Sequence, residues 1–170
     1  MVGLILASLL PHAPNSIEEK VAFSFRGVSY VHRYSKGNLH EYTPKGKSDL
    51  KSWVDMITVN DYPAVKSGDE LAKTANSVLS TYKDHKGDVI KTSSVPRTAK
   101  KEAEHVIVVM FPTGETAFAR FLMSGGHGHS IVYSHRISGK KLESAMNQWL
   151  TKNGGGCEGA IMGMSTIPKH

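Results

Sequence analysis

The sequence has little cysteine and none of the common catalytic motifs, and each absence excludes a class of protein. Cys157 is the single cysteine in 170 residues, which excludes an intramolecular disulfide framework and any paired-cysteine zinc or redox motif. The glycine-rich phosphate loops of nucleotide-binding proteins do not occur, nor does the G-x-S-x-G turn of serine hydrolases. No apolar run is long enough to cross a bilayer as a helix, so we expect no membrane span.

Composition and charge are those of an ordinary globular protein. Hydrophobic residues make up 39% of the chain and charged residues 21%, and a chain of this length can bury a core without disulfides. The net charge of +6 favours acidic partners such as nucleic acid or anionic lipid. However, the basic residues form only small clusters without interleaved aromatic side chains. We therefore do not expect nucleic acid as a partner. A cytoplasmic protein that associates with nucleic acid is the weakest of three hypotheses, because only the charge supports it.

The N-terminus begins with an apolar run, Val2–Leu10, which a proline-containing segment follows. The run is too short to span a bilayer but matches the hydrophobic region of a signal peptide. The positively charged segment that should precede it is missing, so a truncated signal over residues 1–16 and a buried strand or helix both remain open. We favour the first interpretation, which makes the protein periplasmic or secreted, whereas the second makes it cytoplasmic. Residues 17–170 are then expected to form a single α+β domain.

Two kinds of hydrophobic periodicity predict the secondary structure. Alternation with a period of two, together with one continuous apolar run, predicts strands over 21–25, 28–34, 39–43, 55–60, 89–94, 105–111, 116–123 and 130–137. Ser67-Gly-Asp-Glu70 is a capping box, and apolar residues at spacings of three and four predict a helix from there to about Asp84. A second amphipathic helix should begin after Ser138 and end at Asn153-Gly154, before a last short helix over 158–164.

This order of elements predicts an α+β fold with a largely antiparallel sheet. The continuous apolar strand at 105–111 predicts helices on both faces of the sheet. The stretch Leu50-Lys-Ser-Trp-Val-Asp-Met-Ile-Thr-Val59, the helix after it and the strand meander before the last helix resemble the PsbP-like fold. That fold belongs to extrinsic accessory proteins of photosystem II and to a nuclear import factor that binds Ran. The sequence also resembles exported bacterial proteins with Trp-x-Asp-Met and Tyr-Ser-His-Arg stretches. The resemblance implies an αβα sandwich with a binding or accessory role.

His127 and His129 are the candidate metal ligands, in the stretch SGGHGH. Two residues at this spacing in a strand point to one face about 6.5 to 7 Å apart, and their imidazoles could both bind one zinc or copper ion. A third ligand is needed, and Glu104, His105 or Asp55 could supply it. The alternative is a flexible hairpin tip whose two histidines are solvated.

Four other residues invite a chemical interpretation. Cys157 follows three glycines and is expected to open a helix, where exposed amides can lower a thiol pKa; the alternative is a small buried residue. Ser134 and His135 are neighbours on one predicted strand, so they point to opposite faces and cannot form a nucleophile–base pair. Arg120 either faces solvent or pairs with an acid on a neighbouring strand, Glu102 or Glu104.

The leading hypothesis is a non-enzymatic, exported accessory or binding protein without a cofactor, whose partner is an unidentified protein or small ligand. The alternative hypothesis is a metal-binding protein, or a metal- or thiol-dependent enzyme, that uses the His127/His129 turn or Cys157.

Overall fold

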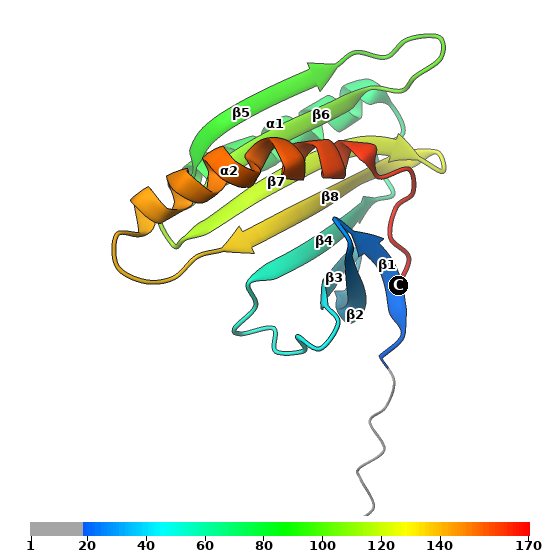
Figure 1. Cartoon of the computed structure of the whole chain (residues 1–170). Helices are drawn as coiled ribbons and strands as arrows, with labels where there is room; N and C mark the ends of the chain where they lie inside the picture. Colours follow the sequence, from blue (N-terminus) through cyan, green and yellow to red (C-terminus); the bar gives the residue numbers. More distant parts are fainter. Residues whose placement is uncertain (1–18) are drawn as a thin grey trace, which may run out of the picture.

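The computed structural model describes residues 19–170, which form one antiparallel sheet and two helices (Figure 1). The sheet has eight strands in the order β1-β2-β3-β4-β8-β7-β6-β5. The strands are β1 (Val21–Phe25), β2 (Val28–Lys36), β3 (Leu39–Pro44), β4 (Asp55–Tyr62), β5 (Asp88–Val95), β6 (Glu104–Met110), β7 (Glu115–Ser124) and β8 (His127–Arg136). The predicted α+β class with an antiparallel sheet is confirmed. The predicted leader over residues 1–16 lies outside the described residues, so export stays a prediction.

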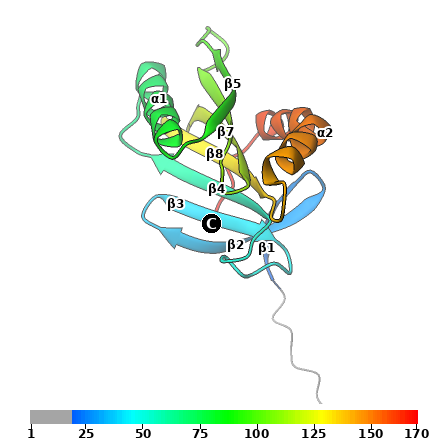
Figure 2. The same ribbon diagram turned by 90° about the vertical axis from the view of Figure 1, so that its left-hand side faces the viewer.

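The two helices, α1 (Gly68–Asp84) and α2 (Leu142–Gly163), pack on opposite faces of the sheet (Figure 2). The alternation of β6 explains this arrangement, because Ile107 packs with α1 whereas Val106 and Val108 pack with α2. Each face thus has its own hydrophobic core, and the larger one lies between the sheet and α2. Neither helix in residues 19–170 has the length and hydropathy needed to cross a membrane.

Helix α1 begins at the predicted capping box. The Ser67 hydroxyl accepts a hydrogen bond from the Glu70 amide, and the Glu70 carboxylate accepts one from the Ser67 amide. Two otherwise free amides of the first turn are therefore satisfied. Leu71 and Ala75 of this helix are buried against the sheet, as the spacing of its apolar residues predicts.

Helix α2 differs from its predicted form. It continues without interruption through Gly154, Gly155 and Gly156, where the sequence predicted an end and a separate short helix. Its N-cap is Lys141 in the left-handed conformation, with no side-chain hydrogen bond, and not Ser138. Each glycine costs about 1 kcal/mol relative to alanine inside a helix. Burial of Cys157 and Ile161 against the sheet outweighs this cost, because tertiary packing provides most of the stability of a helix.

Arg120 is buried beneath α2 and pairs with Glu104, which was one of the two predicted alternatives. Its Nη2 lies 3.1 Å from Glu104 Oε1, and its Nε donates to Oε2 at the same distance. Its Nη1 donates to the carbonyls of Ile161 and Met164 at the end of α2. One side chain therefore neutralises a buried carboxylate and satisfies carbonyls that the helix end leaves free.

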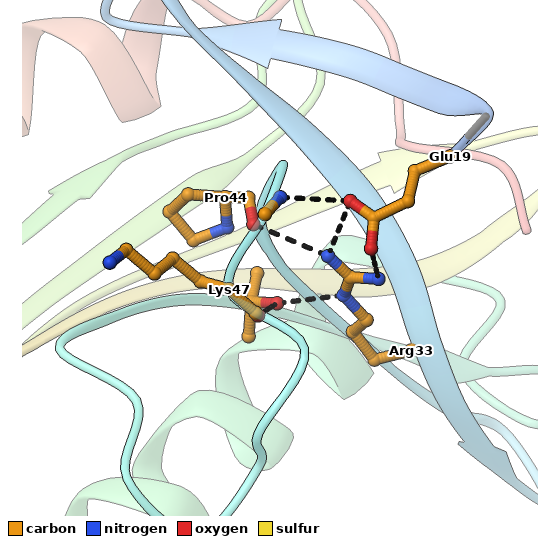
Figure 3. Close-up of polar contacts among 6 residues, drawn as sticks. Glu19, Arg33, Pro44 and Lys47 are labelled. Atoms are coloured by element: carbon orange, nitrogen blue, oxygen red, sulfur yellow. Dashed lines mark hydrogen bonds and ion pairs between the residues drawn. The ribbon is translucent and has the colours of Figure 1, made fainter. Parts of the chain in front are cut away.

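A second ion pair closes the loop that follows β3 (Figure 3). Arg33 donates to both carboxylate oxygens of Glu19, to the Thr43 hydroxyl and to the Pro44 carbonyl. The Glu19 carboxylate also accepts a hydrogen bond from the Gly46 amide. The hydrogen bonds from Arg33 and Gly46 lower the pKa of Glu19 to about 2. This cluster fixes the chain before β1 to the loop before β4.

Candidate functional site

The neighbouring strands β4 and β8 bring together two aspartate–histidine pairs. Their antiparallel register places Asp55 opposite His135 and Asp61 opposite His129. All four side chains lie on the face that α2 covers, because they alternate in step with the core residues Ile57 and Ile131. The pairs stand at opposite ends of the ladder, roughly 20 Å apart for strands that rise about 3.3 Å per residue.

The Asp61 pair contains one predicted metal ligand, His129, and lies next to the other, His127. Ligand atoms of Asp61, His127 and His129 all lie within 4.8 Å of one another. Asp61 Oδ1 is 2.6 Å from His129 Nδ1, and the ring centroids of His127 and His129 are 4.2 Å apart. Zn–N and Zn–O bonds of about 2.0 to 2.2 Å in a tetrahedral site separate the ligand atoms by roughly 3.4 Å. Small adjustments of these three side chains therefore suffice to surround one ion.

His129 also makes a hydrogen bond of the kind that orients histidines bound to metal ions. Its Nε2 lies 3.0 Å from the Ser124 carbonyl oxygen, which can only accept, so Nε2 holds a proton. In the neutral ring, Nδ1 then directs its lone pair at the Asp61 carboxylate, which is unfavourable unless a proton or a metal ion lies between them. Histidines that bind metals commonly donate their second N–H to a backbone carbonyl in this way.

The glycine turn of the predicted site is shorter than expected. Only Gly125 and Gly126 form the hairpin turn, with φ of 58° and 79°, and His127 already begins β8. Gly128, between the two histidines, is needed for packing and not for the turn, because a Cβ at this position would lie 2.7 Å from Val65 Cγ1. His129 is buried, with 6% of its surface exposed, and this excludes the alternative in which both histidines are solvated.

More histidines extend the cluster beyond Asp61. His40 Nε2 lies 3.8 Å from Asp61 Oδ2, and the His40 ring stacks on His170 with 3.5 Å between centroids. Ser35 Oγ is 2.8 Å from a ring nitrogen of His40 and equally close to one of His32. Burial, followed by the charge of His170, lowers the pKa of His40. A neutral His40 is thus a further nitrogen donor beside the same carboxylate.

A buried hydroxyl without a partner lies on the same strand as His40. Tyr42 is fully buried, and its hydroxyl forms no hydrogen bond with residues 19–170. Burial and the charge of Asp61 raise the pKa of Tyr42 to about 12. Asp61, His40 and Tyr42 had not been predicted as site residues. Their strands had been predicted, but the pairing that places β4 between β3 and β8 had not.

The Asp55 pair has different neighbours. Asp55 Oδ1 accepts hydrogen bonds from the Tyr133 hydroxyl at 2.7 Å and from His135 Nδ1 at 2.9 Å. The His135 ring stacks on Trp149 of α2, with 4.1 Å between centroids and 4° between planes. Ser134 points to the other face, where its hydroxyl donates to Glu115. A serine–histidine pair is therefore absent there, as predicted.

Cys157 does not have the environment expected of a reactive thiol. It lies inside α2 and not at the start of a helix, and it is fully buried. Burial raises its pKa, although the nearby Arg26 guanidinium opposes this effect. The prediction that a helix begins at Cys157 is therefore wrong. The structure agrees with the alternative, a small buried residue.

Comparisons with known proteins assign this chain to no family. No family model matches the chain, and no curated protein matches its sequence. Among solved structures that match is human STARD10, with 10% sequence identity, coverage of 78% of this chain and 71% of that chain, and a TM-score of 0.32. The predicted resemblance to PsbP-like proteins is wrong, because no family model, PsbP-like or other, matches the chain. It depended on element order and short stretches, which unrelated folds share.

Proposed function

We propose that this protein binds a transition-metal ion, zinc or copper, through Asp61, His127 and His129. The observation that supports this most strongly is the convergence of three ligand atoms on one point, with His129 oriented by the Ser124 carbonyl. Two imidazoles and one carboxylate suit zinc and copper better than magnesium or calcium, which prefer all-oxygen sites. The predicted role as a binding protein thus acquires a specific ligand class.

The local charge supports the same conclusion. Both nitrogens of the buried His129 face acceptor oxygens, so the pair with Asp61 is complete only when a cation or a second proton lies between them. The neutral His40 next to Asp61 adds a donor without adding positive charge. A divalent ion supplies the missing positive charge, and the buried ring is already held in position.

The test is calorimetric titration of tag-free protein with Zn²⁺ and Cu²⁺, together with thermal unfolding. A ligand at one hundred times its Kd stabilises the folded state by about 2.7 kcal/mol, which for a chain of this size raises Tm by about 5 to 10 °C. The variant His127→Ala should remove most of this shift, because it removes one of the three ligands. His127 is only partly buried, so the substitution spares the core.

A matched control is His85→Ala, which removes an exposed histidine beyond the end of α1. This variant should bind the ion as the unchanged protein does. Absence of zinc or copper binding tighter than about 100 μM would exclude the proposal. So would equal affinity of the His127→Ala variant and the unchanged protein.

A further inference from the structure

A pocket lies at the Asp55 end of the ladder, where the β1–β2 hairpin, the sheet and α2 meet. Its volume is about 270 Å³. Half of its eight lining residues have aromatic side chains: Phe25, Tyr30, Tyr133 and Trp149. Pockets for drug-sized ligands have volumes of about 300 to 1,000 Å³ and combine apolar walls with a few polar groups. This pocket has the same character on a smaller scale, and therefore suits a small metabolite.

One charged group in the pocket is the Asp55 carboxylate. Burial opposes its ionisation, but hydrogen bonds from His135 and Tyr133 outweigh this effect, and the pKa of Asp55 lies below its usual value. Both hydrogen bonds go to Oδ1. The carboxylate is therefore ionised and held in one orientation, with Oδ2 left to accept a hydrogen bond from a ligand.

The other charged group is Arg26, which comes from the turn between β1 and β2. It has a φ of 50° and precedes Gly27, with a φ of 77°, so a long side chain occupies a position that glycine or asparagine normally fills. The guanidinium reaches α2, where its Nη1 donates to Cys157 Sγ at 2.8 Å. Residues held in strained backbone conformations often have a functional purpose. Here the strained turn carries a cation to the edge of an aromatic pocket.

The two charges face the same pocket and form no direct ion pair within residues 19–170, although the charge of Arg26 is a minor contributor to the lowered pKa of Asp55. Asp55 Oδ1 is engaged by Tyr133 and His135, and Arg26 by Cys157. A simple anion would meet the Asp55 carboxylate, and a simple cation would meet the Arg26 guanidinium, so neither is complementary to the whole pocket. A ligand that carries both charges matches both groups. The aromatic rings of the pocket favour contact with an ammonium group and with the apolar part of the ligand.

We propose that this pocket binds a small zwitterion with an apolar body, such as a free amino acid. Its ammonium group lies against Asp55 and its carboxylate against Arg26. The aromatic walls cover the side chain. This site lies at the other end of the sheet from the metal ligands and is independent of them.

The test compares three ligands in calorimetric titrations of the full chain. They are L-phenylalanine, phenethylamine, which lacks the carboxylate, and 3-phenylpropanoate, which lacks the ammonium group. Phenylalanine should bind, and each truncated ligand should bind at least tenfold more weakly. The variant Arg26→Gln should weaken phenylalanine about tenfold and leave phenethylamine unchanged. Its position in an exposed turn keeps the fold intact.

The matched control is Arg97→Gln, since Arg97 is an exposed arginine in the β5–β6 connection. This variant should bind all three ligands as the unchanged protein does, and zinc titration of both variants should be unaltered. Two results would overturn the proposal. One is no binding of phenylalanine up to about 10 mM. The other is equal binding of all three ligands, which would mean that only the aromatic body is recognised.

Discussion

The two ends of the β4–β8 ladder carry the same cross-strand pair but differ in where positive charge comes from. At one end, Nδ1 of His135 faces Asp55, and the Tyr133 hydroxyl donates to the same oxygen. At the other end, Nδ1 of His129 faces Asp61 while its Nε2 is already committed to a carbonyl. The first pair is satisfied by a neutral imidazole, whereas the second needs either a second proton on the ring or a metal ion between the two groups.

This difference shows that neighbouring elements decide the chemistry of a pair. At the Asp55 end, the β1–β2 turn supplies Arg26 and α2 supplies Trp149. At the Asp61 end, β3 supplies the neutral His40 and the start of β8 supplies His127. A cation near the first pair fits a pocket for a charged organic ligand. The several imidazole nitrogens near the second pair fit a metal ion.

The largest expected effect comes from removing Arg120, which anchors the end of α2. Because α2 covers the sheet face that carries both aspartate–histidine pairs, this change should affect both ends. Arg120→Leu leaves the buried Glu104 carboxylate with only the exposed Lys101 as a charged partner and frees the carbonyls at the end of the helix. Breaking a buried pair in this way costs about 3 to 5 kcal/mol. The free energy of unfolding from urea titration should fall by that amount, and both ligand sites should weaken together.

The control for this prediction is the double variant Arg120→Leu/Glu104→Leu, in which no charge stays buried. Replacing both partners by apolar residues is commonly close to neutral, so most of the lost stability should return. A single variant as stable as the unchanged protein would show that α2 is held by its hydrophobic contacts alone. Both ends would then depend on α2 less than the structure indicates.

Matched substitutions of the two aspartates compare how much each end of the ladder contributes to stability. Asp55→Asn weakens two charge-assisted hydrogen bonds and should lower the free energy of unfolding by about 1.5 to 3 kcal/mol at neutral pH. Asp61→Asn should cost roughly 1 kcal/mol or less without metal, because its contact with His129 needs an extra proton. Urea titrations of both variants in chelator give the comparison, and equal losses would contradict it.

The Asp55 contribution should also depend on pH. Folding lowers the pKa of Asp55, so its stabilisation is complete above the unfolded value of about 3.9 and disappears as pH falls through the lower folded value. The difference in stability between the unchanged protein and Asp55→Asn should therefore be constant above about pH 5 and shrink below pH ~4. A difference that persists at pH ~2 would mean that the carboxylate acts only through its shape.

Local patterns in the sequence predicted the elements well and their partners poorly. The capping box at Ser67 and the meander ending in β8 depend on neighbouring residues, and both were predicted. The place of β4 beside β8 depends on pairing between distant residues, so Asp61 could not be recognised as a neighbour of His127 and His129. The path of α2 through its glycines was missed for a related reason, because burial of Cys157 outweighs the local preference against a helix.

The smallest expected effect tests why the two ends have different hairpin turns. Both turns have two residues with positive φ, but one is Arg26-Gly27 and the other Gly125-Gly126. A left-handed conformation costs an ordinary residue roughly 1 to 2 kcal/mol, and asparagine tolerates it better. Arg26→Asn should therefore raise the free energy of unfolding by about 0.5 to 1 kcal/mol while it weakens binding of phenylalanine about tenfold.

The reciprocal variant, Gly125→Arg, should lose roughly 1 to 2 kcal/mol of unfolding free energy, because it places a residue with a side chain in a left-handed conformation. Urea titration and calorimetry on the two variants measure both effects. If Arg26→Asn is less stable than the unchanged protein, the Arg26 contact with Cys157 outweighs the backbone strain. Arg26 would then support the fold as well as the pocket, and the turn at the Asp55 end would need no functional explanation for its strained residue.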